Sequence, residues 1–341
     1  MTATIGWDIG GAHVKAARAQ GGRLTQIVQR ACAPHESVAS LEQALRDARA
    51  ALGDAGRHRV TMTAELSDAF ESRARGVVAV AAMAAREIGG SDILFYAGER
   101  GLIARDEIGA NVDAIASANW RASAEFVARH CADALFIDIG STTADLTPIR
   151  AGRIAALGAN DAERLACGEL AYAGLSRGAP QAYATLAPLA GRWTPLVNEA
   201  FASMADVRRV LGDIPEGESD ADLSPTADGR AKTVAASRAR LARLAGRDAA
   251  ELSDAQWRAL AEFLDRAQLR AIEDQIALLQ SRDAVGLDTP MVCAGVGRKL
   301  AARLAQAQGR AFTDFADLIA APPALAAKAA HCAPATALAL L

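Results

Sequence analysis

A short pattern occurs twice in this 341-residue chain, and each copy joins an apolar run to a glycine turn. The first copy is Ile5-Gly-Trp-Asp8-Ile-Gly10-Gly11, and the second is Leu135-Phe-Ile-Asp138-Ile-Gly140-Ser-Thr-Thr143. The apolar residues before each aspartate predict a buried strand, and the glycines permit a tight turn whose amides can converge on an anion. Two such turns, each followed by another strand-like run, predict a site for a chain of phosphates.

The two aspartates, Asp8 and Asp138, constrain what else this site contains. A carboxylate 4 Å from a phosphate oxygen is repelled by roughly 4 kcal/mol at an effective dielectric constant of 20. A divalent cation removes this repulsion, and Mg²⁺ favours one or two carboxylates together with water and phosphate oxygens. We therefore expect Asp8 and Asp138 to be catalytic residues that hold Mg²⁺, directly or through water. The alternative is two ordinary strand ends at which an aspartate begins a turn.

Other polar residues near the two turns are candidates for phosphate binding. Lys15 lies on the strand after the first turn, where its ammonium group could reach a phosphate, and we count it among the catalytic residues. His13 is either a hydrogen-bond donor to the ligand or a surface residue. The remaining candidates are the turn residues themselves: Gly10, Gly11, Gly140, Ser141, Thr142 and Thr143.

A third glycine turn lies near the end of the chain. Residues 290–294 predict a buried strand, Gly295 and Gly297 follow it, and a helix is predicted as far as Ala307. A strand, a glycine turn and a helix N-terminus together can bind an anion or a nucleotide. A plain tight turn explains the same residues, because a GxG pattern alone is weak evidence.

The order of predicted elements is that of a layered α/β protein. Three strands, a helix, a strand, a helix and a strand precede the second aspartate, and the order begins again there, which indicates duplicated βββαβαβ units. We predict a first lobe over residues 1–130 and a second over 131–341, with a helical insertion around 180–285. Residues 211–230 are rich in Gly, Asp, Ser and Pro and predict a mobile loop that could close over a ligand.

Several stretches give more local predictions. Residues 114–129 and 161–174 each read as one helix, and the chain from residue 180 onward reads as almost wholly helical. Residues 76–85 are too short for a membrane span and predict a buried helix. Residues 318–341 are apolar but contain prolines and charged residues, so they predict an irregular tail rather than a span.

Composition excludes several classes of function. The net charge is −3 with scattered Lys and Arg, so nothing predicts binding to nucleic acid or to an anionic membrane. The five cysteines include no CxxC pair, which argues against a disulfide framework and a zinc knuckle. The N-terminus begins directly with a strand and has no charged leader, so we expect a cytoplasmic protein that acts on small molecules.

Several sequence blocks, in one order, resemble a known family. They are Thr61-Met-Thr-Ala-Glu65-Leu-Ser-Asp68, Ala118-Asn119-Trp120, Asp138-Ile-Gly-Ser-Thr-Thr143, Arg164-Leu-Ala-Cys-Gly168-Glu169-Leu170 and Thr226-Ala-Asp228-Gly229-Arg230. The chain resembles the hydantoinase A and oxoprolinase branch of the superfamily of acetate and sugar kinases, actin and heat-shock chaperones. Within that branch it is similar to the tetrahydromethanopterin-linked one-carbon pathway proteins, which include the methanofuran-biosynthesis synthase.

This resemblance implies a two-lobed, actin-like (ribonuclease H-like) ATPase fold with helical insertions. It also implies a transferase of methanofuran or methylofuran biosynthesis, in which the phenol oxygen of a tyrosine or tyramine unit, often carrying glutamate, displaces diphosphate from an aminomethyl-furan-methyl diphosphate. An aryl ether results. The diphosphate-binding candidates then include Gly168, Glu169, Gly295 and Gly297 beside the two turns. The chain departs from archaeal relatives at His13 and Val14, where they tend to carry Asn and Thr.

The implied nucleophile needs help to lose its proton. A phenol with a pKa near 10 is about three units from ionising at pH 7, which costs roughly 4 kcal/mol. General-base catalysis is typically worth about 10²–10⁴-fold, and the candidates are Glu65, His13, Asp161 and Glu169. Glu65 leads as a catalytic residue because it lies just beyond a predicted strand, where open α/β sheets bind ligands. The alternative role for Glu65 is structural: its carboxylate would accept hydrogen bonds from nearby backbone amides at the start of a helix.

Two other classes of function are compatible with these features. The same three glycine turns ordinarily hold ATP, so an ATP-dependent small-molecule kinase or a hydantoinase/oxoprolinase-type amidohydrolase is the first alternative. ATP would then join Mg²⁺ as a cofactor, with Gly295 and Gly297 against the adenosine. The second alternative is a non-catalytic nucleotide sensor or scaffold. Ligand protection of the fold and the activity of aspartate variants separate these functions.

Overall fold

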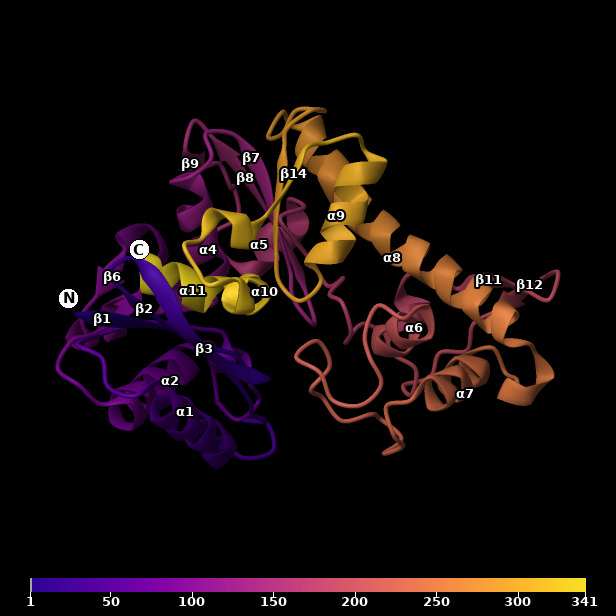
Figure 1. Ribbon diagram of the computed structural model, residues 1–341, viewed down its shortest axis with the longest axis horizontal. Coiled ribbons are helices and arrows are strands. Elements are labelled where there is room, and N and C mark those ends of the chain that lie inside the picture. Colours follow the sequence, from indigo (N-terminus) through magenta and orange to yellow (C-terminus); the bar gives the residue numbers. More distant parts are fainter. Residues whose placement is uncertain (1) are drawn as a thin grey trace.

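Two mixed sheets and a helical unit make up residues 2–341, which are the residues that the computed structural model describes (Figure 1). The first sheet has the strand order β3-β2-β1-β4-β5-β6. Its strands are β1 (Ala3–Ile9), β2 (His13–Gln20), β3 (Arg23–Ala31), β4 (Arg57–Met62), β5 (Ile93–Tyr96) and β6 (Leu102–Ile103). Strands β1 to β3 form the predicted antiparallel meander, and β4 and β5 run parallel to β1. The carboxyl ends of β1 and β4 therefore meet at one edge of the sheet.

The second sheet repeats this plan around β7. Its strand order is β10-β8-β7-β13-β14, with β9 paired to β8. The strands are β7 (Ala134–Ile139), β8 (Ala144–Arg150), β9 (Arg153–Ile154), β10 (Leu170–Ala171), β13 (Met291–Ala294) and β14 (Phe312–Asp314). As β1 does in the first sheet, β7 lies between an antiparallel hairpin partner, β8, and a parallel strand, β13. This mixed α/β architecture confirms the predicted fold class.

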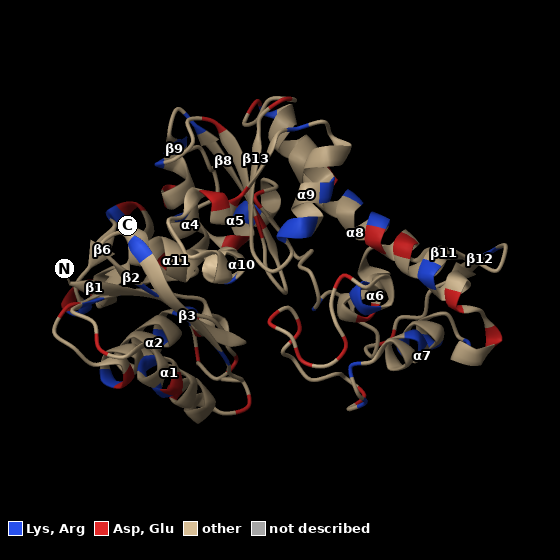
Figure 2. Cartoon of the chain, viewed as in Figure 1, with Lys and Arg blue, Asp and Glu red and all other residues tan. Residues whose placement is uncertain are grey.

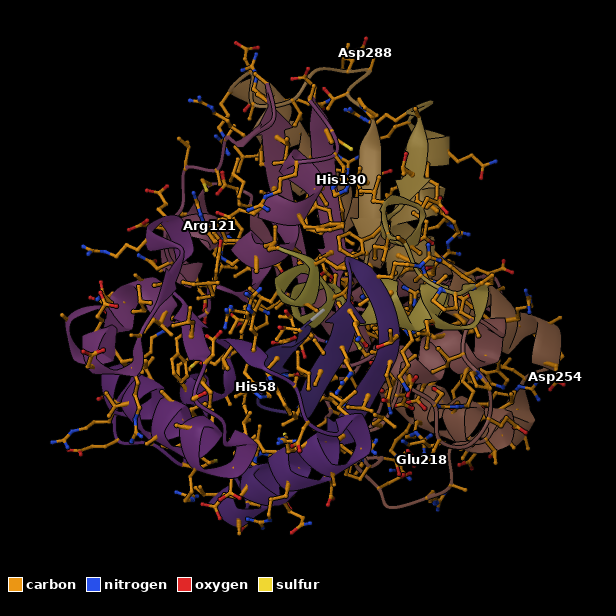
Figure 3. The ribbon with its side chains drawn as sticks, turned by 60° about the vertical axis from the view of Figure 1, so that its left-hand side comes forward. His58, Arg121, His130, Glu218, Asp254 and Asp288 are labelled. Atoms are coloured by element: carbon orange, nitrogen blue, oxygen red, sulfur yellow. The ribbon has the colours of Figure 1, made fainter. Side chains whose placement is uncertain are left out.

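Helices α1 (Val38–Leu52) and α2 (Arg73–Ile88) pack against one face of the first sheet. The inward side of α1 is apolar at helical spacing, with buried Leu41, Leu45, Ala48 and Leu52. Beneath the helices, the indole nitrogen of Trp7 on β1 donates a hydrogen bond to Nδ1 of His58 on β4 (3.2 Å). His58 is buried on this sheet (Figure 3). The pair joins two neighbouring strands below the site edge.

The last helix, α11 (Ala333–Leu340), lies between the two sheets (Figure 1). Ala335 and Ala339 pack with residues of the first sheet, whereas Ala333 and Ala337 pack with residues of the second. Gly6 on β1 permits this approach, because a Cβ atom there would lie 2.1 Å from the carbonyl oxygen of Ala335. The helix backbone therefore rests directly on β1.

The prediction of an irregular C-terminal tail is wrong, because residues 323–340 form α10 (Pro323–His331) and α11. A helix between two sheets is buried on nearly all sides, so it lacks the amphipathic period by which surface helices are recognised. Its proline, Pro334, lies in the first turn, where no intrahelical hydrogen bond is lost. The proline that suggested irregular structure is therefore compatible with the start of a helix.

The helical unit extends away from the second sheet (Figure 1). It comprises β11 (Leu186–Leu189), β12 (Arg192–Pro195), α6 (Met204–Leu211), α7 (Val234–Leu244) and the long α8 (Asp254–Ser281). Met204, Leu241, Trp257 and Leu260 lie at the centre of a separate core in this unit. The sequence predicts a loop over residues 211–230. In the structure residues 212–233 contain no regular helix or strand, and Asp222 anchors them by an ion pair to Arg209.

Three local predictions need correction. The chain after residue 180 is not wholly helical, because Ala190 and Gly191 adopt positive φ angles of 50° and 77° and turn β11 into β12. The helix predicted over 161–174 is only α5 (Asp161–Ala166), since Gly168 turns the chain into β10 with φ of 80°. The helix predicted over 114–129 is broken at Ser117, whose φ is 51°. The pieces are α3 (Val112–Ile115) and α4 (Asn119–Ala128).

Charges are interspersed over the surface, as the composition suggests; basic and acidic residues follow one another along α8 (Figure 2). Over residues 2–341, no helix combines the length and the apolar character that a membrane crossing requires. The remaining helix of ordinary length, α9 (Arg298–Ala307), packs on the second sheet. Short 3₁₀ helices are η1 (Ala64–Leu66), η2 (Gly98–Arg100), η3 (Arg105–Ala110), η4 (Pro180–Ala182), η5 (Ala249–Glu251) and η6 (Phe315–Leu318).

Candidate active site

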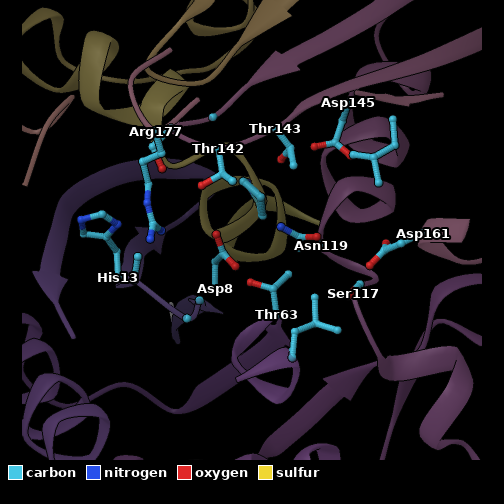
Figure 4. Close-up of a pocket in the computed structure, with 18 of the residues that line it drawn as sticks. Asp8, His13, Thr63, Ser117, Asn119, Thr142, Thr143, Asp145, Asp161 and Arg177 are labelled. Carbon is cyan, nitrogen blue, oxygen red and sulfur yellow. The ribbon is translucent and has the colours of Figure 1, made fainter. Parts of the chain in front are cut away.

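Both aspartate turns face one cavity of about 420 Å³, which we call the first cavity. Asp8 lies near the end of β1 and Asp138 near the end of β7, and both line this cavity. Figure 4 shows Asp8 near the middle of the site, with Thr142 and Thr143 of the second turn above it. Two carboxylates from distant parts of the chain therefore share one cleft.

Each of the two turns is closed by a backbone hydrogen bond at the equivalent position. The amide of Gly10 donates to the carbonyl oxygen of His13 (2.9 Å), and the amide of Gly140 donates to that of Thr143 (2.9 Å). Within residues 2–341, no hydrogen-bond partner exists for the four amides at the turn tips, which belong to Gly11, Ala12, Ser141 and Thr142. The three hydroxyl groups of the second turn also have none there. These donors can bind an anion without breaking a bond of the fold.

The residues opposite the two aspartates differ in charge. In the first hairpin Asp8 pairs across the strands with Lys15, whose Nζ lies 3.9 Å from Oδ2 of Asp8. At the corresponding position of the second hairpin, Asp138 pairs with Asp145. Asp145 accepts a hydrogen bond from the buried guanidinium of Arg164 (2.7 Å). These two strand pairs and Arg164 therefore bring together three carboxylates and two cations that partly balance them.

This accumulation of carboxylates alters their ionisation. Burial and the neighbouring Asp145 and Asp8 raise the pKa of Asp138 to about 7, although Lys15 opposes the shift. Burial is also the main reason that the pKa values of Asp8 and Asp145 are raised. Burial disfavours the charge of Lys15, but Asp8 and Asp138 outweigh this effect and raise its pKa. The ionised site therefore carries negative charge that a further cation would stabilise.

The donor set fits Mg²⁺ better than a metal held by protein alone. The buried Oδ1 atom of Asp8 has no hydrogen-bond partner, which is costly unless a cation or water reaches it. Within the described part of the chain, no group of three or more His, Cys, Asp and Glu residues is arranged to hold a metal ion. Mg²⁺ is commonly held by one or two carboxylates, with water and substrate phosphate completing its shell. Asp8 and Asp138 are suited to that arrangement.

The raised pKa of Asp138 predicts a pH effect on stability in metal-free buffer. Folded Asp138 keeps its proton up to about pH 7, whereas the ordinary value for aspartate is 3.8. Folding binds a proton between these values, so this group lowers stability as the pH rises. We expect the free energy of unfolding of Asp138→Asn, relative to wild type, to rise from pH 4 to 7 and then level off. Urea unfolding at stepped pH measures this difference, and a flat profile would contradict it.

Glu65, the leading candidate base, lies behind the cavity wall and does not line it. It follows β4 in η1, is 1% exposed, and accepts hydrogen bonds from the amide (2.8 Å) and hydroxyl (3.1 Å) of Ser117. Ser117 does line the first cavity, and its positive φ is stabilised by these bonds. The geometry thus favours the alternative interpretation, in which Glu65 accepts hydrogen bonds from local groups and positions Ser117 in the cavity wall.

Gly168 and Glu169 also lie outside the first cavity. The carboxylate of Glu169 is fully buried and accepts hydrogen bonds from the amides of Leu157 (2.8 Å) and Gly158 (3.0 Å). It also pairs with Arg282. With these partners Glu169 fixes the segment that precedes α5. Arg164 and Leu170 of the same sequence block line the first cavity, whereas Gly168 and Glu169 do not.

The third glycine turn packs against the end of β7 rather than opening to the first cavity. The amide of Gly297 donates to the carbonyl oxygen of Ile139 (2.8 Å), and that of Gly295 donates to Ala330 (2.8 Å). A Cβ atom on Gly295 would lie 2.4 Å from Oδ1 of Asp138. Both amides already have hydrogen-bond partners in the fold, and these glycines permit close packing beside Asp138.

The structure adds site residues that the sequence prediction did not include. Asp145 occupies the position in the second hairpin that Lys15 occupies in the first, so aligning the two copies would have found it. Asn119 lines the cavity from the start of α4 and belongs to a block already recognised. Arg177 also lines it, but no motif surrounds this residue. Asp161, a candidate base, lines the cavity and lies 3.4 Å from Arg73.

Paired sheets with a shared central plan, and two acidic hairpins facing one cleft, define an actin-like ATPase fold. The solved nucleotide-free structure of an acetone carboxylase, from work on ATP-dependent acetone carboxylation, matches 99% of this chain and 70% of its own, with 12% identity and a TM-score of 0.61. A ROK family glucokinase from Streptomyces griseus matches 98% of both chains, with 16% identity and a TM-score of 0.49.

The chain belongs to the hydantoinase/oxoprolinase family, whose sequence profile matches residues 57–333. This confirms the family predicted from the sequence blocks. A curated relative is the (4-{4-[2-(gamma-L-glutamylamino)ethyl]phenoxymethyl}furan-2-yl)methanamine synthase of Methanocaldococcus jannaschii, which is 27% identical over 224 residues. The match covers 65% of this chain and 66% of that relative, slightly under two thirds of its length.

Proposed function

We propose that this chain forms an aryl ether by transferring a furan-methyl group from a diphosphate ester to a phenol, in the synthesis of a methanofuran-type cofactor. The relative from Methanocaldococcus jannaschii is named for a product with such a phenoxymethyl-furan ether, which supports this reaction class. The observation that carries the proposal is the first cavity, where two hairpins present unpaired amides and carboxylates to one space. Such a site suits a diphosphate that must leave with its charge neutralised.

The residues of the cavity have distinct roles in this reaction. The bond between the furan methylene carbon and the diphosphate oxygen breaks, and a bond between that carbon and the phenol oxygen forms. The free amides and hydroxyls of the two turns bind the diphosphate oxygens, and Lys15 supplies positive charge beside them. Asp8 and Asp138 would hold Mg²⁺, directly or through water, and the ion would supply positive charge beside the leaving group. Glu65 positions Ser117 in the wall.

Product analysis tests the proposal directly. Purified protein is mixed with the furan-methyl diphosphate, Mg²⁺ and a γ-glutamyl tyramine acceptor, and we expect one equivalent of diphosphate for each ether detected by mass spectrometry. Tyramine and tyrosine are tested as alternative acceptors. Absence of ether together with ATP hydrolysis in the presence of small acceptors would instead favour the kinase or amidohydrolase alternative.

We expect diphosphate with Mg²⁺ to protect the fold, because it would bind the native cavity and not the unfolded chain. A ligand present at 100 times its dissociation constant adds about 2.7 kcal/mol to the free energy of unfolding. Thermal denaturation with Mg²⁺ alone, with Mg²⁺-diphosphate and with Mg²⁺-ATP measures this effect. Greater protection by ATP than by diphosphate at equal concentrations would contradict the proposal and support nucleotide use.

A further inference from the structure

A second cavity, of about 880 Å³, adjoins the first. Five residues line both: Gly11, Ala12, His13, His35 and Arg177. The far side of the second cavity is formed by the helical unit, through residues 198–203, 205 and 206 and the loop over 222–227. The tip of the first aspartate turn therefore forms part of the boundary between two adjoining spaces.

The lining of the second cavity suits an amphipathic ligand better than a second anion. Phe201, Leu223 and Pro225 supply apolar surface, while Gln181 and Asn198 supply amide groups. The arginines from α6 and α7 that line it are already neutralised, since Arg209 pairs with Asp222 and Arg240 pairs with Asp206. An aromatic ring with a polar substituent can bury its apolar part there and retain hydrogen bonds.

Arg177 differs from those arginines. In the described chain it has neither an ion-pair nor a hydrogen-bond partner through its side chain. Figure 4 shows its guanidinium group reaching toward His13, at the boundary between the two cavities. Burial, and then the positive charges of Lys15 and Arg177, lower the pKa of His13 to about 4. The positive charges of Arg177 and Lys15 near this boundary would also favour an oxyanion.

We propose that the second cavity binds the phenolic acceptor and that Arg177, at the boundary, is a catalytic residue that stabilises its phenolate. The inference rests on the proposed function and identifies where the second substrate binds. A transferase needs two substrates in contact, and the adjoining cavities would bring the phenol oxygen to the furan methylene carbon. The phenol releases its proton to water, its oxygen forms the new carbon–oxygen bond, and diphosphate leaves with the electron pair of the broken bond.

The test compares acceptors of different acidity. At saturating acceptor, we expect Arg177→Gln to reduce kcat about 100-fold with a tyramine-type phenol. The kcat defect should shrink below about 5-fold with ring-fluorinated analogues that ionise near neutral pH, because these bind already ionised. Arg192→Gln is the matched control, because Arg192 is exposed on β12, outside both cavities. A defect of the same size for every phenol would overturn the role of Arg177.

A second variant tests the location of the acceptor. Ala227 lines only the second of the two cavities, so Ala227→Trp is expected to raise KM for the acceptor at least tenfold while leaving KM for the furan diphosphate within about twofold. An increase confined to the diphosphate substrate, or loss of ATP binding instead, would overturn the assignment. Wild-type protein that forms no ether would overturn the proposed function, whereas ether formation with unaltered acceptor KM in Ala227→Trp would overturn this inference alone.

Discussion

Asp8→Asn and Asp138→Asn are each expected to reduce diphosphate release by at least about 10³-fold while leaving the fold intact. Asparagine keeps the size of the side chain but removes the charge that would hold Mg²⁺ beside the leaving group. Neither aspartate carboxylate has a hydrogen-bond partner in the described chain, so the substitution breaks no hydrogen bond that the fold needs. Steady-state kinetics over a range of Mg²⁺ concentrations, with circular dichroism of each variant, measures both effects.

A matched control is Asp113→Asn, since Asp113 is exposed on α3 and lies outside the first cavity. Its activity should stay within twofold of wild type. Folded Asp8→Asn or Asp138→Asn protein with wild-type turnover would refute the two-carboxylate site. Loss of turnover in both would argue against a non-catalytic sensor or scaffold.

The second large effect concerns stability. Gly6→Ala is expected to lower the free energy of unfolding by about 3 kcal/mol or more, because the new methyl group overlaps the backbone of α11. Its Cβ atom would lie 2.1 Å from Ala335 O and 2.6 Å from Ala339 N, and neither backbone atom can move without shifting the helix. Equilibrium unfolding in urea measures the loss.

Gly109→Ala serves as the comparison, since a Cβ atom there would meet nothing within 4 Å. We expect it to change stability by less than about 1 kcal/mol. Equal stability of Gly6→Ala and wild type would show that α11 does not rest on β1 in solution.

Helices and strands were predicted correctly where the sequence signal is local, that is, where it lies within one strand or along one face of one helix. The strand predicted over residues 290–294 forms as β13 (Met291–Ala294), and both aspartate hairpins form as expected. The prediction failed where a helix is buried on all sides, and where a single residue with a positive φ angle changes the direction of the chain. Thus α11 shows no polar face to reveal a helix, and positive φ angles at Ser117 and Ala190 are adopted by residues that do not usually favour them.

The part of the site that could be predicted is the part whose sequence pattern occurs twice. Duplication of the Asp-Gly turn identified Asp8 and Asp138 as a pair, and the structure places them in one cavity. Glu65 and Gly297 were harder to interpret, because a sequence does not reveal whether a carboxylate or an amide already has a partner inside the fold. In the structure Glu65 binds Ser117, and the amide of Gly297 binds Ile139. Arg177 could be identified as a site residue only from its position in the folded structure.

The position of α11 also constrains how this chain can acquire its structure during synthesis. The first sheet is complete by residue 103, yet the helix that covers its inner face spans Ala333–Leu340. Until those residues leave the ribosome, apolar side chains of β1 and β2 remain open to water and to other chains. Deletion of residues 333–341 should therefore expose that surface and cause aggregation rather than only the loss of one helix.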